Sequence, residues 1–108
     1  MTESSSAPSP DAIRQKISAG EFRAALRDID SLLDLDPCSS DALYMAAVCH
    51  RYTAQYEQAQ DCLEKLKSLS ADRGRVYQEQ GHLDMARQRP EQALAAFANA
   101  CQLNPALV

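Results

Sequence analysis

The sequence predicts an all-α protein, a right-handed α-solenoid of about three helix-turn-helix units. The main observation is a period of 34 residues, which relates Ala25, Ala59 and Ala93. A repeat of this length is typical of helix pairs that bury their apolar faces only against neighbouring pairs. The same period also indicates a scaffold for binding rather than for chemistry. It is kept by four further sets: Phe22, Tyr56 and Pro90; Ile29, Leu63 and Phe97; Leu32, Leu66 and Ala100; Leu35, Leu69 and Leu103.

The first unit, about residues 6–39, is expected to contain two helices. The first helix covers about residues 11–19 and ends at Gly20, because glycine tolerates the left-handed conformation that follows a helix. The second covers about residues 22–35, where apolar side chains recur at i, i+3, i+4 and i+7. Pro37 ends it, since proline cannot donate the helical hydrogen bond.

The second unit, about residues 40–73, and the third, about residues 74–107, repeat this plan. Ser39, Ser40 and Asp41 are candidate N-caps for the second unit, and Asp72 is one for the third. Pro90 suits the first turn of a helix, where its missing N–H would be unpaired anyway. We expect helices at about 41–53, 56–69, 74–87 and 90–103, with Asn104 and Pro105 ending the last.

Composition places the chain among globular proteins of one domain, at residues 10–108. Residues 1–9 are polar and rich in Ser and Pro, so we expect a disordered lead-in, and they lack the features of a signal peptide. A net charge of -4 and a pI near 5.0 argue against a nucleic-acid surface. No apolar run approaches ~20 residues, so no membrane partner is expected.

The four cysteines show neither CxxC pairing nor useful spacing from a histidine. Thiols without a disulfide framework suit a reducing interior, so we expect a cytoplasmic protein. We interpret the cysteines as small apolar or surface residues, and a metal or redox role is the alternative. They are Cys38, Cys49, Cys62 and Cys101.

These residues together resemble a tetratricopeptide repeat array of three units. The second-helix pattern is well kept, as in Ala93, Phe97, Ala100 and Pro105. The small residue of the first helix is Ala47 in the second unit and Gly81 in the third, and small residues let neighbouring helices approach closely. The first unit departs from the pattern, because Ile13 takes this position and Pro8 and Pro10 lie at the start of the helix.

A second, shorter resemblance concerns residues 41–44, 48–52, 74–82 and 100–107. They are similar to the N-terminal repeat region of bacterial proteins whose later half is a sulfotransferase domain. The resemblance implies that the catalytic part lies outside this chain. A sulfotransferase needs backbone N–H groups that cradle a phosphosulfate, usually in a glycine-bearing loop. We assign the three glycines to helix ends and helix packing instead.

The resemblance also implies that the first helices line a concave face that binds a partner protein or peptide. Tyr, Arg and Met are suited to such a face, because they bury a large area on contact. The wider set includes Asp41, Met45, Glu79 and Ala86, with Arg14, Ile17 and Ser18 from the first unit. The residues selected for the groove are Tyr44, Val48, Arg51, Tyr52, Arg75, Gln78, His82 and Met85.

Several alternatives remain open for these residues. Tyr44 and Tyr52 could simply pack between units. The repeats that clamp a carboxylate terminus carry Lys and Asn where this chain has Tyr44 and Val48, and Glu79 would repel a carboxylate. Glu79 and His82 share a helix face, but no third metal ligand is identifiable. We therefore expect no catalytic residues, no metal and no cofactor, and an independent enzyme is the rival class.

The end of the chain predicts weak self-association. It stops at Ala106, Leu107 and Val108, where a fourth unit or a capping helix would begin. The face that carries Leu94, Phe97 and Cys101 would then be partly bare. We expect a longer parent protein to cover it, or two copies to form a homodimer that Leu107→Asp weakens.

Overall fold

The protein is all-helical in the part that a computed structural model describes, residues 9–69 and 73–103. Six α-helices occupy most of these residues, and no strand occurs among them. The prediction of an all-α fold is therefore confirmed. Two helices have the predicted bounds, three begin and end one residue earlier, and one, α4, begins as predicted and ends one residue earlier. They are α1 (Pro10–Ser18), α2 (Phe22–Leu35), α3 (Ser40–Tyr52), α4 (Tyr56–Ser68), α5 (Arg73–Ala86) and α6 (Pro90–Leu103).

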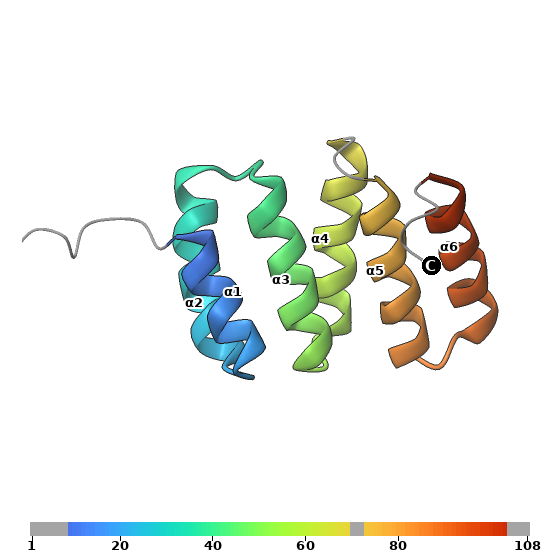
Figure 1. Cartoon of the computed structure of the whole chain (residues 1–108), viewed down its shortest axis with the longest axis horizontal. Coiled ribbons are helices and arrows are strands. Elements are labelled where there is room, and N and C mark those ends of the chain that lie inside the picture. Colours follow the sequence, from blue (N-terminus) through green and yellow to red (C-terminus); the bar gives the residue numbers. More distant parts are fainter. Residues whose placement is uncertain (1–8, 70–72, 104–108) are drawn as a thin grey trace, which may run out of the picture.

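Each helix packs against the next helix in the chain. In Figure 1 the pair α1 and α2 overlaps at one end of the long axis, and α3, α4, α5 and α6 follow in order. Two further contacts skip one helix, α1 with α3 and α3 with α5. The first helices of the three units therefore contact one another along one side. The expected lead-in, the Asp72 cap, the break at Pro105 and the terminal residues 106–108 all lie outside the described residues, except Ser9 at the boundary.

Serine side chains cap the first helices of two units. The backbone N–H of Ala12 donates to the Ser9 hydroxyl over 3.1 Å, and that of Ala42 donates to the Ser39 hydroxyl over 3.3 Å. Of the three candidate caps before α3, Ser39 is therefore the one used. Each cap satisfies a backbone donor at a helix start that has no partner within the helix.

The turns inside the three units share one backbone conformation. Gly20, Ala54 and Gln88 have φ angles of 81°, 61° and 62°, and they are spaced by the 34-residue period. Only the first unit places a glycine at this left-handed position, which other L-residues adopt at a cost. The repeat thus extends to the turn geometry, although the residue type does not.

The core consists of two clusters that follow one another along the chain. One lies among α1, α2 and α3, with Ile13 and Ile29 fully buried, and the other lies among α3, α4 and α5, with Leu63 and Leu83 fully buried. Leu33 packs against both and links them. The remaining cluster residues are Ala25, Ala42, Met45, Ala46 and Cys49 in the first, and Leu43, Ala47, Ala59, Leu66 and Val76 in the second.

The small positions of the repeat are buried, which lets neighbouring helices approach closely. Ala59 and Ala93 are each 1% exposed. In the third unit, an ideal Cβ on Gly81 would lie 2.5 Å from Cε1 of Phe97, so the ring occupies the space that a side chain would need. In the first unit Ile13 takes this position and is fully buried, which shows how the shorter α1 still fills the core.

Polar contacts join the second and third units. Gln60 of α4 and Gln80 of α5 exchange hydrogen bonds of 2.9 and 2.8 Å. Lys67 donates to the same Gln80 oxygen over 3.1 Å, and Gln80 donates to Asp84 over 3.1 Å. Every buried side-chain polar atom in the described part of the chain has a partner. The α4–α5 boundary is therefore held by a satisfied polar network as well as by apolar packing.

Candidate partner-binding groove

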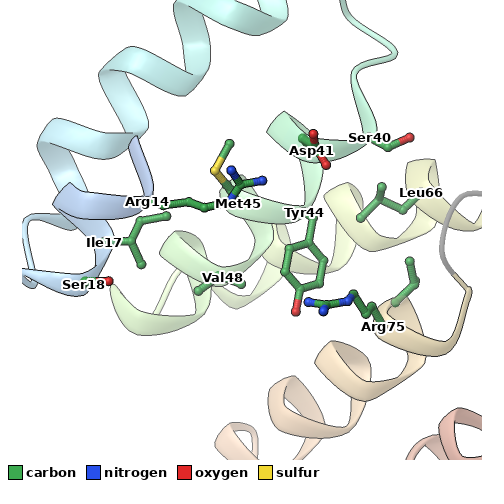
Figure 2. Close-up of a pocket in the computed structure, with 11 residues that line it drawn as sticks. Arg14, Ile17, Ser18, Ser40, Asp41, Tyr44, Met45, Val48, Leu66 and Arg75 are labelled. Carbon is green, nitrogen blue, oxygen red and sulfur yellow. The ribbon is translucent and has the colours of Figure 1, made fainter. Parts of the chain in front are cut away.

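A groove of about 580 Å³ lies between the first helices of the three units (Figure 2). Helices α1, α3 and α5 supply ten of its residues, and α4 supplies one, Leu66. The side chains that line it are Arg14, Ile17, Ser18, Ser40, Asp41, Tyr44, Met45, Val48, Leu66, Arg75 and Val76.

Helix periodicity explains the central wall of this groove. On α3, Asp41, Tyr44, Met45 and Val48 are separated by three, four and seven positions, so they lie on one face. The 34-residue period then places Arg75 of α5 beside this face, at the position equivalent to Asp41. The groove is thus a consequence of stacking one unit on the next.

Apolar side chains form most of the groove surface. Met45, Leu66 and Val76 are buried within it and Ile17 and Val48 are half-buried, so the surface is already packed from behind. A pre-formed apolar floor with a few polar groups around it is the usual construction of a site for a ligand or a peptide.

Tyr44 and Arg75 form the main polar pair of the groove. The Tyr44 hydroxyl points toward the Arg75 guanidinium in Figure 2. Burial raises the pKa of Tyr44, and the negative charge of Glu79 adds to this effect, whereas Arg75 opposes it. The phenol therefore stays protonated at neutral pH and offers both a donor and an acceptor to a ligand.

A second guanidinium lies at the α1 end of the groove. Arg14 extends from α1 toward Met45 (Figure 2), and its Nη1 lies 3.1 Å from the Asp11 carboxylate. Because both side chains of this pair are largely exposed, the pair holds Arg14 only weakly. The groove thus has one cation on α1 and another on α5, with the Asp41 carboxylate on α3.

Three of the eight residues selected from the sequence line this groove: Tyr44, Val48 and Arg75. The wider projection of the concave face adds Arg14, Ile17, Ser18, Asp41 and Met45, which also line it. The other five selected residues, Arg51, Tyr52, Gln78, His82 and Met85, lie elsewhere.

Arg51 and Tyr52 are engaged in contacts between helices. The Arg51 guanidinium pairs with the Glu79 carboxylate of α5 and also lies 4.5 Å from the centre of the Tyr52 ring. The Tyr52 ring stacks on Phe22 of α2, with centroids 4.7 Å apart and an interplanar angle of 5°. Both side chains are thus engaged in contacts between helices and do not line the groove, although the charge of Arg51 acts on Tyr44.

Gln78, His82 and Met85 lie on α5 at the positions equivalent to Tyr44, Val48 and Arg51. The groove is built where three successive first helices meet, and in the described part of the chain no first helix follows α5. His82 is exposed and meets Phe97 edge-on, with centroids 5.2 Å apart. Met85 is 54% exposed. These residues therefore form a surface rather than a groove.

Sequence reasoning missed Ser40, Leu66 and Val76. Val76 follows Arg75 directly and is buried in the second core cluster, so a projection of exposed faces does not select it. Leu66 belongs to a second helix, whereas the concave face was projected from first helices only. Leu66 belongs to the apolar set Leu32, Leu66 and Ala100 of the 34-residue period. This membership was the available signal that Leu66 packs toward the following first helix.

The described residues hold no group of three or more metal-binding side chains that could bind an ion. The cysteines are unpaired thiols. Burial raises the pKa of the Cys49 thiol to about 11 and also raises that of Cys62. Both thiols are therefore poor nucleophiles at neutral pH, since the thiolate is the reactive form. Nδ1 of His50 donates a 2.8 Å hydrogen bond to Oε1 of Gln55, which fits a structural role.

Comparison of the chain with protein-family models and with curated proteins gave no match. Among the described helices, none has the length and apolar character needed to span a bilayer.

Proposed function

We propose that the chain is a non-catalytic interaction scaffold, a right-handed solenoid of three tetratricopeptide-like units that binds a segment of a partner protein in its groove. The observation that carries this proposal is the groove itself, because its walls come from the first helix of every unit. A site assembled by the repeat follows from the architecture and needs no inserted loop.

The contacts between helices support the solenoid part of the proposal. Each helix packs against its neighbours in the chain, and α1, α3 and α5 contact one another in order. This arrangement is the one expected when a 34-residue helix pair is stacked three times. The close approach of Phe97 to Gly81 supports the tetratricopeptide resemblance, since the small first-helix residue is the position where the second helix rests.

The composition of the groove supports a protein segment as the ligand. An extended peptide carries apolar side chains for the floor and backbone amides for Tyr44, Asp41 and the two guanidinium groups. Tyr and Arg are the residue types that most often dominate the energy of such contacts. We expect Tyr44 and Arg75 to be the main anchors.

The wider context in this proposal is the repeat region of a bacterial sulfotransferase-like protein of the cytoplasm. The resemblance of residues 41–44, 48–52 and 74–82 supports it. In that context the chain presents a partner to a catalytic domain encoded in the same reading frame. Sequencing the parent gene tests this context separately from the groove.

The experiment that tests the groove is selection of binding peptides from a random display library, followed by calorimetry on purified variants. Tyr44→Ala and Arg75→Ala should each weaken a selected peptide by at least about tenfold, as expected for interface anchors. Tyr52→Ala is the matched control, since Tyr52 lies on the same helix but outside the groove. Its effect should stay within about twofold.

Circular dichroism must show that all three variants remain folded. Peptides that bind wild type and Tyr44→Ala equally, or that lose affinity only in Tyr52→Ala, would contradict the groove as the binding site.

A further inference from the structure

The last helix, α6, differs from the other second helices in its surface chemistry. From Gln92 to Leu103 it carries no charged side chain. The exposed faces of α2 and α4 carry charged residues throughout, such as Arg27 and Asp30 on α2 and Glu57 and Asp61 on α4. Leu94 is 70% exposed on α6, and alanines surround it. A helix without charges on its exposed face is typical of a contact surface.

The 34-residue period shows what the equivalents of the α6 residues Leu94, Phe97 and Cys101 contact in the other two units. Leu26, Ile29 and Leu33 occupy the equivalent positions of α2. There, Leu33 also packs against the cluster that contains Leu43 and Ala47 of α3. This stripe of α2 is therefore covered by the first helix of the next unit.

The same holds for α4, where the stripe is Gln60, Leu63 and Lys67. Gln60 and Lys67 hydrogen-bond Gln80 of α5, and Leu63 is fully buried. On α6 the stripe is Leu94, Phe97 and Cys101, which we call the α6 stripe. Phe97 packs against Gly81 and His82 of its own unit and is half-buried, as is Cys101. In the described part of the chain no helix follows α6, so the α6 stripe is the equivalent of a unit interface that no following first helix contacts there.

Two copies of this chain could cover the α6 stripe in two ways. In a head-to-tail stack, α1 of the next copy would take the place of α3 or α5. The interface residues Ala46 and Cys49 of α3 correspond to Ala12 and Gln15 of α1. Gln15 is exposed and polar, so α1 offers little apolar surface to the stripe.

The α6 stripe is instead complementary to itself. In an antiparallel pair with the two-fold axis near Phe97 and Ala98, the large Leu94 of one copy lies over the smaller Cys101 of the other. Ala98 lets the helices approach, and no like charges meet. We propose that α6 forms a two-fold interface with a second copy of the chain through Leu94, Phe97 and Cys101.

This interface is independent of the groove, because no residue of the α6 stripe lines it. A helix of 14 residues is about 21 Å long, so the contact is smaller than a standard interface of about 800 Å² per partner. We therefore expect weak association, with a dissociation constant on the order of 100 μM.

Analytical ultracentrifugation over a range up to about 1 mM tests the proposal. Wild type should show a concentration-dependent dimer, and Leu94→Asp should weaken it by at least about tenfold, because a buried carboxylate without a partner opposes contact. Leu35→Asp is the matched control, since Leu35 is 72% exposed at the end of α2. It should leave the association unchanged. A monomer throughout the range, or equal loss in both variants, overturns the proposal.

Cys101 provides a second test that does not rest on Leu94. The proposed axis separates the two Cys101 residues by seven helical positions, or about 10 Å along the helix. In a Cys38→Ser background, a bismaleimide that spans about 10–15 Å should crosslink two copies. Adding Cys101→Ser should remove the crosslink. A crosslinked dimer that survives Cys101→Ser places the contact on another surface and overturns the proposal.

Discussion

Arg51 and Glu79 form an ion pair that joins α3 to α5 across the boundary between the second and third units. The Glu79 side chain is 3% exposed and that of Arg51 is 17% exposed. A second contact, from Nη2 of Arg51 to Oε1 of Glu79, measures 3.3 Å, so the pair is bidentate. The guanidinium of Arg51 thus compensates a carboxylate that is almost completely buried.

Removing Arg51 should destabilise the protein strongly, because it leaves the Glu79 charge buried without its partner. We expect Arg51→Ala to lower the free energy of unfolding by about 3 kcal/mol. Arg14→Ala is the control, since it breaks the exposed pair with Asp11 and should cost less than about 0.5 kcal/mol. Urea unfolding followed by circular dichroism measures both. Equal costs for the two variants would show that the buried pair contributes no more than a surface pair.

Gly81→Ala should also destabilise the protein, although alanine is the better helix former. The new Cβ would start 2.5 Å from Cε1 of Phe97, so the ring must move away. We expect a net loss of about 1–2 kcal/mol after the gain in helix propensity. Phe97→Leu in the same background should recover part of the loss, because it frees space next to residue 81. A Gly81→Ala variant as stable as wild type would mean that the ring moves without cost.

Helix positions could be predicted from the sequence because the period, the apolar spacing and the breakers agree. Gly20 and Pro37 end helices where expected, and α2 and α6 have the predicted bounds. The turn conformation at Ala54 and Gln88 could not be predicted from residue type, since neither is a glycine. The 34-residue spacing from Gly20 was the available signal.

The groove could be predicted only in part, because a face of a helix does not specify which side chains remain turned toward it. Tyr44, Val48 and Arg75 were found by projection. Arg51 projects to the same face, yet the buried carboxylate of Glu79 draws it into the unit boundary. The two residues of this pair are 28 positions apart and lie on different helices. A projection of each helix by itself cannot show that they meet.

Ala54→Gly should stabilise the protein. Ala54 has a φ of 61° and is exposed, so glycine removes the conformational cost and loses no packing. We expect a gain of about 1 kcal/mol, and Gln88→Gly should behave similarly. Ala24→Gly is the opposite control, because residue 24 lies inside α2, where glycine should cost about 1 kcal/mol. Thermal unfolding of the three variants gives the signs, and a loss in Ala54→Gly would contradict the reasoning.

Stability should fall at alkaline pH, in part because of Cys49. Burial raises the pKa of this thiol from 9.0 to about 11. Below pH 9 the thiol is protonated in both the folded and the unfolded chain, so it does not affect the free energy of unfolding. Above pH 9 the unfolded chain loses the proton first, and stability falls as the pH rises through 11, by about 2–3 kcal/mol.

Urea unfolding at pH 7.5 and at pH 10.5 measures this change. Cys49→Ala should show a smaller fall between the two values than wild type, because Tyr44 and Cys62, whose pKa values are also raised, remain in the variant. An equal fall in both proteins would assign the alkaline loss to groups other than Cys49.

Helix α1 is the shortest of the six and fully buries one side chain, Ile13, yet it forms one wall of the groove. Local opening should therefore begin at α1, and each opening would withdraw Arg14, Ile17 and Ser18 from a bound segment. A ligand binds only molecules in which α1 is closed. The measured affinity is therefore the intrinsic affinity multiplied by the fraction of molecules with α1 closed. Amide hydrogen exchange should report this linkage, since a ligand in the groove would slow exchange in α1 more than in α6.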